Sequence, residues 1–468
     1  MSSWKKVKLK DICSKIGSGS TPRGGNNVYL HSGIISLIRS QNIHNHGFIA
    51  DGLVYIDQEK ADKLKNVIVE ENDVLINITG DSVARVALVD KMYLPARVNQ
   101  HVAILRAVPE ILDHRYLKYY LVNLPTQQHL LTLASSGATR NALTKSMLEN
   151  LEILLPNIND QRRIADSLEI LDNKIQLNTQ TNQTLEQIAQ AIFKSWFVDF
   201  DPVKAKIDAI TNGGTHADAE RAAMQVISGK TNAELTQMQQ TNPDAYKTLE
   251  KTAALFPSEM VESELGDVPK GWGIGCIGDI ATAKGGYAFK SSQFEQKGNP
   301  VIKIKNITST GNIILEDCQC INDLVANVAS KFKLSDGDFL MAMTGATVGK
   351  IGIYVSDGRC AFVNQRVAKF ESKLFKNIPC WYTYNLIRRS DVSEKIIGSA
   401  QGSAQANISS SGIEQVAIML PIRDLIYLYQ STVSHLYEKW IANHKELLKL
   451  KMTRDTLLPK LLSGELNN

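Results

Sequence analysis

The chain has 468 residues, a formal net charge of +4 at pH 7 and 21% charged residues. This length predicts more than one domain, and the weak positive charge permits nucleic-acid binding without arguing for it. No apolar run is long enough to cross a membrane and no leader-like segment is present, which predicts a cytoplasmic protein with no membrane contact. The six cysteines form no CxxC pair, so they predict reduced thiols and no metal site.

Residues 1–156 are predicted to form a first domain of mixed α/β type. Short β-rich runs separated by Gly, Asn and Asp lie at 34–38, 74–78 and 86–89, and helices are expected near 113–123 and 126–134. This pattern is typical of a domain with much antiparallel strand.

The same plan returns further along the chain, displaced by 265 residues. Three features recur at this offset: Val98–Ala103 as Val363–Ala368, Asp73–Gly80 as Asp338–Gly345, and the pair Gly137 and Pro156 as Gly402 and Pro421. The offset is too long for a solenoid repeat, so it indicates a tandem duplication in which residues 269–421 are the second copy. Two similar domains in one chain suit two half-sites on DNA better than one small-molecule pocket.

Each copy is followed by a predicted long helix, at 157–203 and at 422–468. Apolar residues between 164 and 196 alternate at steps of four and three, as in the a/d seam of a coiled coil, and the seam repeats 265 residues later. The residues expected to hold the pair together are Leu171, Asn178, Leu436 and Asn443. Asn178 maps onto Asn443, and a buried Asn in a seam fixes register, which favours pairing of the two helices over packing of each on its own domain. Pro459 is expected to kink or end the second helix near Leu457.

The connector between the copies, 204–268, has no counterpart in the repeat. Its composition predicts short helices around 216–228, 232–240 and 243–254. Two interpretations stay open, a solvated connector and a partner-docking surface.

The sequence lacks the motifs of a self-sufficient methyltransferase or nuclease and of a nucleotide-hydrolysing P-loop. Residues 242–246, Asn-Pro-Asp-Ala-Tyr, are not the motif of an adenine methyltransferase, and 345–350 lacks one spacer residue and the Ser or Thr of a Walker A loop. The latter recurs as 80–85 with Arg in place of Lys, which favours phosphate contact over nucleotide hydrolysis. His44 and His46 are interpreted as a surface pair.

Candidate DNA-binding residues lie in irregular segments of both copies, because Arg and Lys suit guanine or phosphate and Asn and Gln suit adenine. The first copy offers Ser20, Arg23, Arg39, Gln41, Asn42, Arg85, Arg97, His101, Thr139 and Arg140. The second offers Lys284, Tyr287, Lys303, Lys305, Asn306, Lys350, Arg359, Arg366, Gln401, Gln405 and Asn407. A solvated loop residue is the alternative at every position. The Asn-Gln pairs at 99–100 and 364–365 are present in both copies, which suits a structural role instead.

Three strings, 191–202, 263–272 and 457–466, together with the duplicated layout, resemble the specificity subunit of a type I restriction-modification system over the whole chain. The resemblance implies two target-recognition domains that each recognise half of a split double-stranded DNA site. It implies two long antiparallel helices that separate these domains and dock two methyltransferase subunits, with motor-nuclease subunits in the full complex. It also implies no catalysis by this chain and no cofactor in it, since S-adenosylmethionine, ATP and Mg²⁺ are expected on the partner subunits.

The resulting prediction is an α+β protein with two tandem pseudo-symmetric α/β target-recognition domains separated by an antiparallel coiled coil. A helix of about 40 residues spans roughly 60 Å, a length suited to presenting two domains to major grooves that recur every ~34 Å. The alternative is a duplicated coiled-coil adaptor that binds protein partners without recognising DNA.

Overall fold

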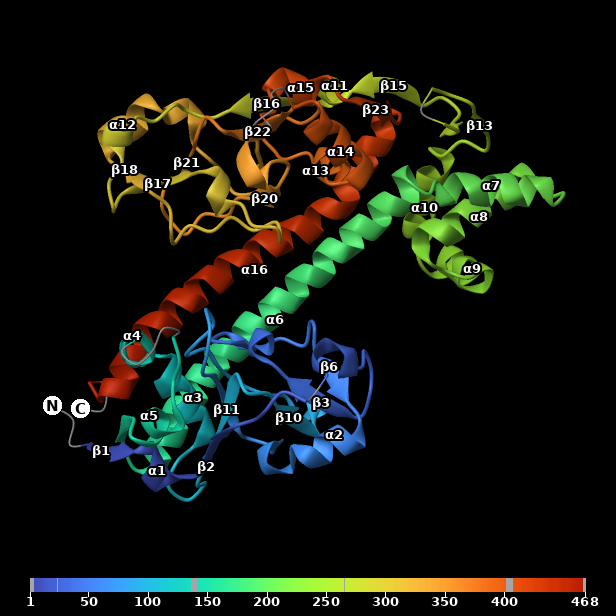
Figure 1. Ribbon diagram of the computed structural model, residues 1–468. Coiled ribbons are helices and arrows are strands. Elements are labelled where there is room, and N and C mark those ends of the chain that lie inside the picture. Colours follow the sequence, from blue (N-terminus) through green and yellow to red (C-terminus); the bar gives the residue numbers. More distant parts are fainter. Residues whose placement is uncertain (1–3, 23, 136–140, 265, 401–406, 466–468) are drawn as a thin grey trace. The chain divides into compact units, whose positions relative to one another are not determined.

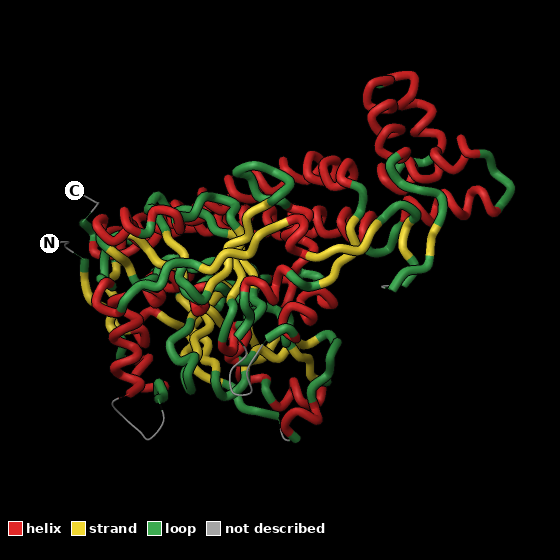
Figure 2. The backbone as a smooth tube through the Cα atoms, turned by 90° about the horizontal axis from the view of Figure 1, so that it is seen from above, coloured by secondary structure: helices red, strands yellow, loops and turns green. Residues whose placement is uncertain are grey.

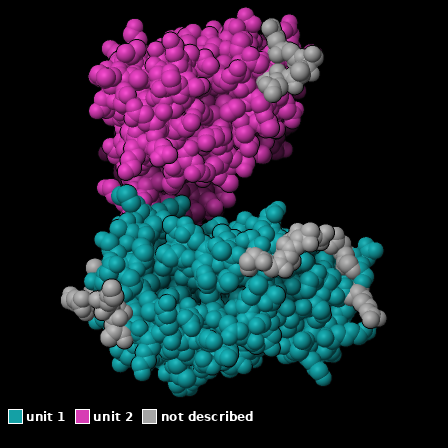
Figure 3. Space-filling view, turned by 60° about the vertical axis from the view of Figure 1, so that its left-hand side comes forward, with its two compact units in different colours: residues 1–176, 450–468 teal, residues 177–449 magenta. Residues whose placement is uncertain are grey.

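The computed structural model describes residues 4–22, 24–135, 141–264, 266–400 and 407–465 (Figure 1). The chain divides into two compact units, coloured in Figure 3. Unit 1 comprises 1–176 and 450–468, and unit 2 comprises 177–449. Each unit therefore holds one copy of the repeat and part of each long helix.

Unit 1 contains two four-stranded sheets. The first is antiparallel, in the order β2 (Cys13–Ser18), β11 (Val102–Ala107), β8 (Val74–Asn77) and β9 (Val86–Leu88). The second has the order β6 (Val54–Ile56), β3 (Ile35–Ile38), β10 (Ala96–Val98) and β7 (Ile68–Val69), with β3 and β10 parallel. Their β-branched side chains form strands readily and are buried on both faces of β3 and β8. The expected strands at 34–38, 74–78 and 86–89 are thus confirmed.

Short helices and a closing strand pair complete the first copy. The helices are α1 (Leu9–Ile12), α2 (Gln58–Lys63), α3 (His114–Val122), α4 (Leu124–Ser135) and α5 (Lys145–Glu149). Strand β1 (Lys5–Lys8) pairs antiparallel with β12 (Glu152–Leu155), which joins the start of the copy to its end. Asp113 caps α3 by accepting from the Arg115 N–H at 2.9 Å. Helices α3 and α4 confirm the two helices expected near these positions.

The second copy repeats this plan within unit 2. Its antiparallel sheet has the order β16 (Ala281–Gly285), β22 (Val367–Ser372), β19 (Phe339–Ala342) and β20 (Ile351–Ile353). Beside it lie β18 (Cys320–Ile321), β17 (Asn299–Ile302) and β21 (Phe362–Val363), and β15 (Gly273–Cys276) pairs with β23 (Ala417–Leu420). Its helices are α11 (Ile277–Ile280), α12 (Asp323–Val328), α13 (Trp381–Ile387), α14 (Ser390–Gly398) and α15 (Ser410–Glu414). Matching strand orders in the two antiparallel sheets confirm the duplication.

The two long helices, α6 (Ile158–Phe197) and α16 (Arg423–Ser463), pair antiparallel. In unit 2, Asn182 donates to the Trp440 carbonyl at 3.1 Å, and Tyr429 donates to the Ala189 carbonyl at 3.0 Å. The residue numbers of the contacts thus decrease along α16 as they increase along α6. The expected pairing is confirmed.

Asparagines lie inside this seam. Asn443 donates to the Asn182 side chain at 3.1 Å, and Asn178 donates to Glu446 at 2.8 Å. All three asparagines are buried. Leu436 packs against the core of unit 2, and Leu171 is half-buried in unit 1.

Pro459 does not end the second helix near Leu457, which was one of its two expected effects. Helix α16 continues through Pro459 to Ser463. Leu458 and Leu462, on either side of the proline, belong to the core of unit 1. Their burial holds the last turns in helical form despite the backbone hydrogen bond that proline cannot donate.

The connector is helical and belongs to unit 2. It contains α7 (Asp201–Thr211), α8 (His216–Ser228), α9 (Asn232–Thr241) and α10 (Pro243–Ala254), followed by β13 (Met260–Val261) and β14 (Val268–Pro269). Figure 2 shows its helices gathered into a bundle, whose small core includes Met224 and Leu235. The three expected helices are confirmed, whereas α7 was not predicted as a separate element. The break before it lies at Phe200, whose φ of 56° is left-handed.

None of the described helices combines the length and apolar character that crossing a bilayer would require.

Candidate nucleic-acid interface

Each copy brings three separate segments together at one end of its antiparallel sheet. In copy 1 the Ile78 N–H donates to the His101 carbonyl at 2.9 Å, and in copy 2 the Met343 N–H donates to the Arg366 carbonyl at 3.0 Å. Isolated bridges join 79 to 142 and 344 to 407. His101 and Arg366 therefore occupy the same place on the same backbone frame.

The turn that follows this strand is also shared. Gly80 and Gly345 have φ values of 77° and 75°, and Ala84 and Gly349 have values of 70° and 79°. This turn ends at Arg85 in copy 1 and at Lys350 in copy 2, both half-exposed. A left-handed backbone at both positions gives the two copies the same turn, and a basic residue follows it directly in each copy.

The two copies present different chemistry at this frame. In copy 1 the His101 ring lies within hydrogen-bond reach of the Thr79 hydroxyl and of the Gln100 amide at 3.0 Å. In copy 2, Met343, Gln365, Arg366 and Asn407 line a pocket of about 240 Å³. Arg366 and Asn407 are exposed, and these side-chain types suit guanine and adenine edges.

A second matched feature is a one-turn 3₁₀ helix, η2 (Ser40–Asn42) in copy 1 and η6 (Ile304–Asn306) in copy 2. The Asn42 side-chain oxygen accepts from the Arg39 N–H at 3.1 Å, and that of Asn306 accepts from the Lys303 N–H at 2.9 Å. Both asparagines are buried, so their prediction as DNA-binding residues is corrected: they hold the turn.

The turns leave other side chains accessible. Gln41 and Lys305 are exposed at matched positions. Arg39 donates to the Gly52 carbonyl at 2.7 Å, and the Lys303 ammonium lies 3.6 Å from the centre of the Phe294 ring. Partial burial, and then the nearby charge of Lys305, lower the pKa of Lys303. Arg39 and Lys303 are thus half-exposed and partly engaged within the protein.

Arg97 is also corrected. Its side chain is buried in β10 and donates to the carbonyls of Ala61 at 3.2 Å and Ala96 at 3.0 Å. It is 7% exposed, and burial lowers its pKa. A guanidinium that satisfies backbone carbonyls inside the domain is structural, because leaving those partners unpaired is costly.

The remaining predicted residues are dispersed. Ser20 is exposed, Lys284 pairs with Glu371, Arg359 pairs with Asp357, and Tyr287 packs on Phe289 at 4.9 Å between ring centres. Five of the predicted residues lie outside the described residues: Arg23, Thr139, Arg140, Gln401 and Gln405.

The shared asparagines of the Asn-Gln pairs have a structural role. Asn99 accepts from the His101 N–H at 3.0 Å, and Asn364 accepts from the Arg366 N–H at 3.5 Å. Sequence reasoning missed Thr79 and Met343 as parts of the interface. The 265-residue offset was the signal that could have found them, because both lie within the repeated strings.

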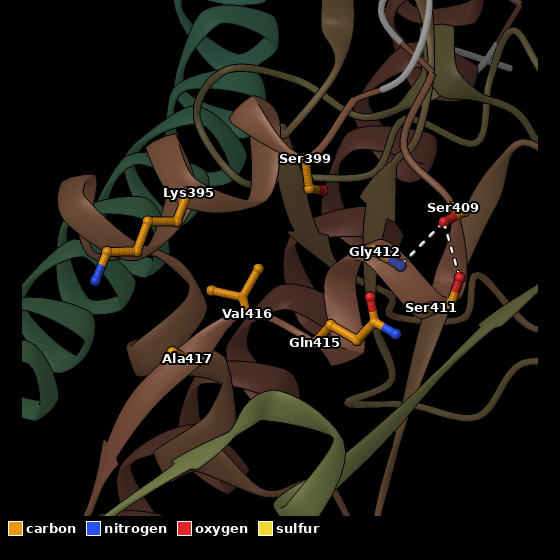
Figure 4. Close-up of a pocket in the computed structure, with 8 residues that line it drawn as sticks. All are labelled: Lys395, Ser399, Ser409, Ser411, Gly412, Gln415, Val416 and Ala417. Atoms are coloured by element: carbon orange, nitrogen blue, oxygen red, sulfur yellow. Dashed lines mark hydrogen bonds between the residues drawn. The ribbon is translucent and has the colours of Figure 1, made fainter.

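A further pocket, drawn in Figure 4, is lined by both polar and apolar residues of copy 2. Ser409 accepts from the Gly412 N–H at 2.9 Å and contacts the Ser411 hydroxyl at 3.0 Å. These bonds cap α15, and Lys395 extends away from the serines (Figure 4). The described residues include no group of three or more His, Cys, Asp and Glu side chains that could hold a metal.

Comparison with known proteins identifies the family. The model of the type I restriction modification DNA specificity domain matches residues 1–187 and 269–431. The chain belongs to this family. As a specificity subunit, it is the DNA-recognition component of a restriction-modification complex with other subunits, and it is not a catalytic subunit.

Relatives of this specificity subunit extend over its whole length. It is 31% identical to the type I restriction enzyme HindI specificity subunit of Haemophilus influenzae, with 100% of both chains covered. It is 25% identical to the MjaIX specificity subunit of Methanocaldococcus jannaschii, over 99% of this chain and 93% of the relative. The crystal structure of the type I restriction-modification S subunit from M. genitalium shares the fold, with a TM-score of 0.55 at 17% identity, covering 98% of this chain and 96% of that one.

Proposed function

We propose that each copy of the repeat recognises one half of a bipartite DNA sequence. The paired helices and the connector dock two methyltransferase subunits, and motor-nuclease subunits join that core. S-adenosylmethionine, ATP and Mg²⁺ are bound by those partners, and the complex acts on DNA in the cytoplasm.

One observation carries this proposal: a single backbone frame occurs twice and holds different side chains. The differing matched pairs are Gln41 and Lys305, Arg85 and Lys350, His101 and Arg366, and Ala142 and Asn407. A shared frame places side chains in equivalent positions, and different side chains select different base edges. This combination is what recognition of two unlike half-sites requires.

Exchange of matched residues tests the proposal directly. Arg366→His gives copy 2 the residue of copy 1, and His101→Arg does the reverse. In the full chain assembled with its methyltransferase, each variant is expected to change the preferred base in one half-site only. Loss of a bidentate base contact costs about 1–3 kcal/mol of discrimination. Sequencing of methylated DNA measures the outcome, and unchanged methylation by both variants would place DNA recognition elsewhere.

The adaptor alternative makes a different prediction. Binding to DNA through phosphates weakens steeply with salt. An adaptor that contacts only proteins would show no salt-dependent binding to duplex DNA in the presence of the methyltransferase.

The number of methyltransferase subunits is tested separately. Because the duplication provides two similar docking faces, two copies are expected per chain. Native mass spectrometry at saturating partner measures the ratio, and a one-to-one complex would contradict this part of the proposal.

A further inference from the structure

A small hairpin in copy 1 lies beside the turn that carries Arg85. It consists of β4 (Ile43–His44) and β5 (Gly47–Phe48). At its tip, Asn45 accepts from the Val86 N–H at 2.9 Å and donates to Gln127 at 3.2 Å. The hairpin is therefore held against the shared frame by backbone and side-chain bonds.

The hairpin presents two histidines. The rings of His44 and His46 are 5.1 Å apart between centres, and the His44 Nε2 atom lies 3.0 Å from the Gln41 carbonyl. His46 is exposed and His44 is half-exposed. The pair thus adjoins Gln41, an accessible residue of the candidate interface.

Helix α16 adds cations to the same place. Lys451 and Arg454 are one helical turn apart, and their charges act on His46 together with those of His44 and Arg85. Arg454 is neutralised, since it pairs with Asp172 at 3.0 Å and Asp455 at 2.9 Å. Among the described residues, neither Arg85 nor Lys451 has an ion-pair or side-chain hydrogen-bond partner.

We propose that His44, His46, Arg85 and Lys451 form a phosphate-binding patch that holds the DNA backbone beside the recognition residues of copy 1. Arg85 from a turn and Lys451 from a helix are uncompensated cations that do not stabilise one another, whereas phosphate oxygens accept from both and from the histidine rings of the hairpin. The inference rests on the proposed function and adds a backbone contact made jointly by a recognition domain and a long helix.

The patch is specific to copy 1. The position that matches Lys451 in the repeat is Glu186, which pairs with Arg388. The segment that follows Asn306, residues 307–311, contains no histidine. Among its described residues, copy 2 has the cation Lys350 at the turn, but it has neither a basic residue at the position matched to Lys451 nor histidines in the segment 307–311. Contact with the DNA backbone through this patch is therefore expected for copy 1 and not for copy 2.

His46 makes this contact depend on pH. Partial burial lowers the pKa of His46, and the charges of His44, Lys451, Arg85 and Arg454 lower it further. Asp172 and Asp455 face Arg454 and offset its charge. The free ring is therefore neutral at pH 7, and an approaching phosphate favours its protonation. DNA binding takes up a proton at the patch and strengthens as the pH falls toward about 6.

The test uses the full-length chain assembled with its methyltransferase and a mixed-sequence DNA duplex, titrated at several salt concentrations. Lys451→Ala is expected to lower affinity on every duplex and to flatten the slope of log affinity against log salt by about one unit. Lys460→Ala removes an exposed charge from the same helix and serves as the matched control. The variant His46→Gln is expected to remove the gain in affinity between about pH 8 and about pH 6.

The outcomes separate the two proposals. If the wild-type chain shows no salt-dependent DNA binding, the proposed function fails and the patch fails with it. If the wild type binds and the patch variants behave like Lys460→Ala, only the patch is overturned. Loss of methyltransferase binding by Lys451→Ala with intact DNA affinity would make the patch a protein contact and would also overturn it.

Discussion

At the scale of single residues, the shared turn shows how one backbone geometry accommodates two sequences. The left-handed position is Ala84 in copy 1 and Gly349 in copy 2. Gln127 donates to the Ala84 carbonyl at 2.8 Å, which fixes the strained turn in copy 1. In copy 2 a Cβ at Gly349 would lie 2.7 Å from the Cδ1 atom of Ile397. Copy 2 therefore depends on glycine where copy 1 does not.

Gly349→Ala is expected to lower the free energy of unfolding of unit 2 by about 1–2 kcal/mol, because the substitution adds left-handed strain and a close contact. Urea unfolding of the full chain measures the change. Gly398→Ala is the control: no atom lies within 4 Å of its Cβ position, and alanine suits a helix. A variant at 349 as stable as the wild type would show that the turn relaxes freely.

The residues three beyond Gly137 and Gly402 carry a specificity prediction. Arg140→Ala is expected to weaken recognition of one half-site and Gln405→Ala that of the other, since Arg suits guanine and Gln suits adenine. Binding to the cognate site and its single-base variants at two salt concentrations measures the effect. A base contact changes preference at one position, whereas a phosphate contact lowers affinity on all sequences. Wild-type affinity of both variants on every duplex would place these loops away from DNA.

At the scale of elements, the seam of α6 and α16 combines apolar residues with an asparagine pair. The Asn182 side chain accepts from Asn443 and donates to the Trp440 carbonyl. Buried polar pairs of this kind cost stability and specify register. The pair thus fixes which turns of the two helices meet.

Asn443→Leu is expected to destabilise the helix pair by about 1–3 kcal/mol, because the Asn182 oxygen loses its donor while it stays buried. The double variant with Asn182→Leu is expected to recover most of that loss. Urea unfolding of the wild type, both single variants and the double variant gives the coupling energy. Additive effects of the two substitutions would mean that the asparagines do not act as a pair.

The elements also show what the sequence could predict. The heptad seam and its matched Asn178 and Asn443 indicated the helix pair. The spacing of apolar residues along a helix can be recognised in the sequence without knowledge of the tertiary structure. The end of α16 was mispredicted because burial of Leu458 and Leu462 outweighs the local effect of Pro459. The start of α7 was missed because apolar spacing does not reveal a left-handed backbone at Phe200.

For the interface, residue type located the accessible Gln41, Arg366 and Asn407. It also selected Asn42, Arg97 and Asn306, whose polar groups are used inside the protein. Composition cannot separate an amide that faces solvent from one that caps a turn, since both occur in irregular segments. Comparison of the two copies distinguishes these two kinds of amide better, because the asparagines that both copies share have structural roles.

At the scale of the whole molecule, the two copies differ in their contacts at one matched position of the long helices. In unit 1, Asp172 of α6 accepts from Lys118 at 2.9 Å, Tyr119 at 2.8 Å and Arg454 at 3.0 Å. The position matched to Asp172 in unit 2 is Tyr437, whose ring stacks on Trp381 at 3.9 Å. At this matched position, copy 1 has an ion-paired carboxylate and copy 2 has stacked aromatic rings.

This difference predicts unequal sensitivity to acid. Burial opposes ionisation of Asp172, but Lys118, Arg454 and Tyr119 hold its pKa below the ordinary value. Its stabilising contribution is therefore present above the unfolded carboxyl pKa of about 4 and is lost as the pH falls through the folded pKa. Unit 1 is expected to lose protection before unit 2 on acidification. Hydrogen exchange of the full chain at several pH values measures both units separately.

Asp172→Asn is expected to reduce the stability of unit 1 by about 1–3 kcal/mol at neutral pH, with a smaller difference in acid. Asp455→Asn, at an exposed residue that also pairs with Arg454, is the control. If the variant and the wild type differ equally at all pH values, ionisation of Asp172 does not account for the effect.

The chain is synthesised from its N-terminus, and the end of α16 belongs to unit 1. Unit 1 therefore cannot be completed until the last residues have been made. The ribosome finishes copy 1 first, yet residues 450–468 belong to the same unit, and Leu458 and Leu462 complete its core. Residues 177–449 are made in between, which takes roughly 15–55 s at 5–20 residues per second. A product truncated in copy 2 therefore lacks part of the first core. We expect such fragments to be degraded by proteases rather than to accumulate as half-specific DNA-binding proteins.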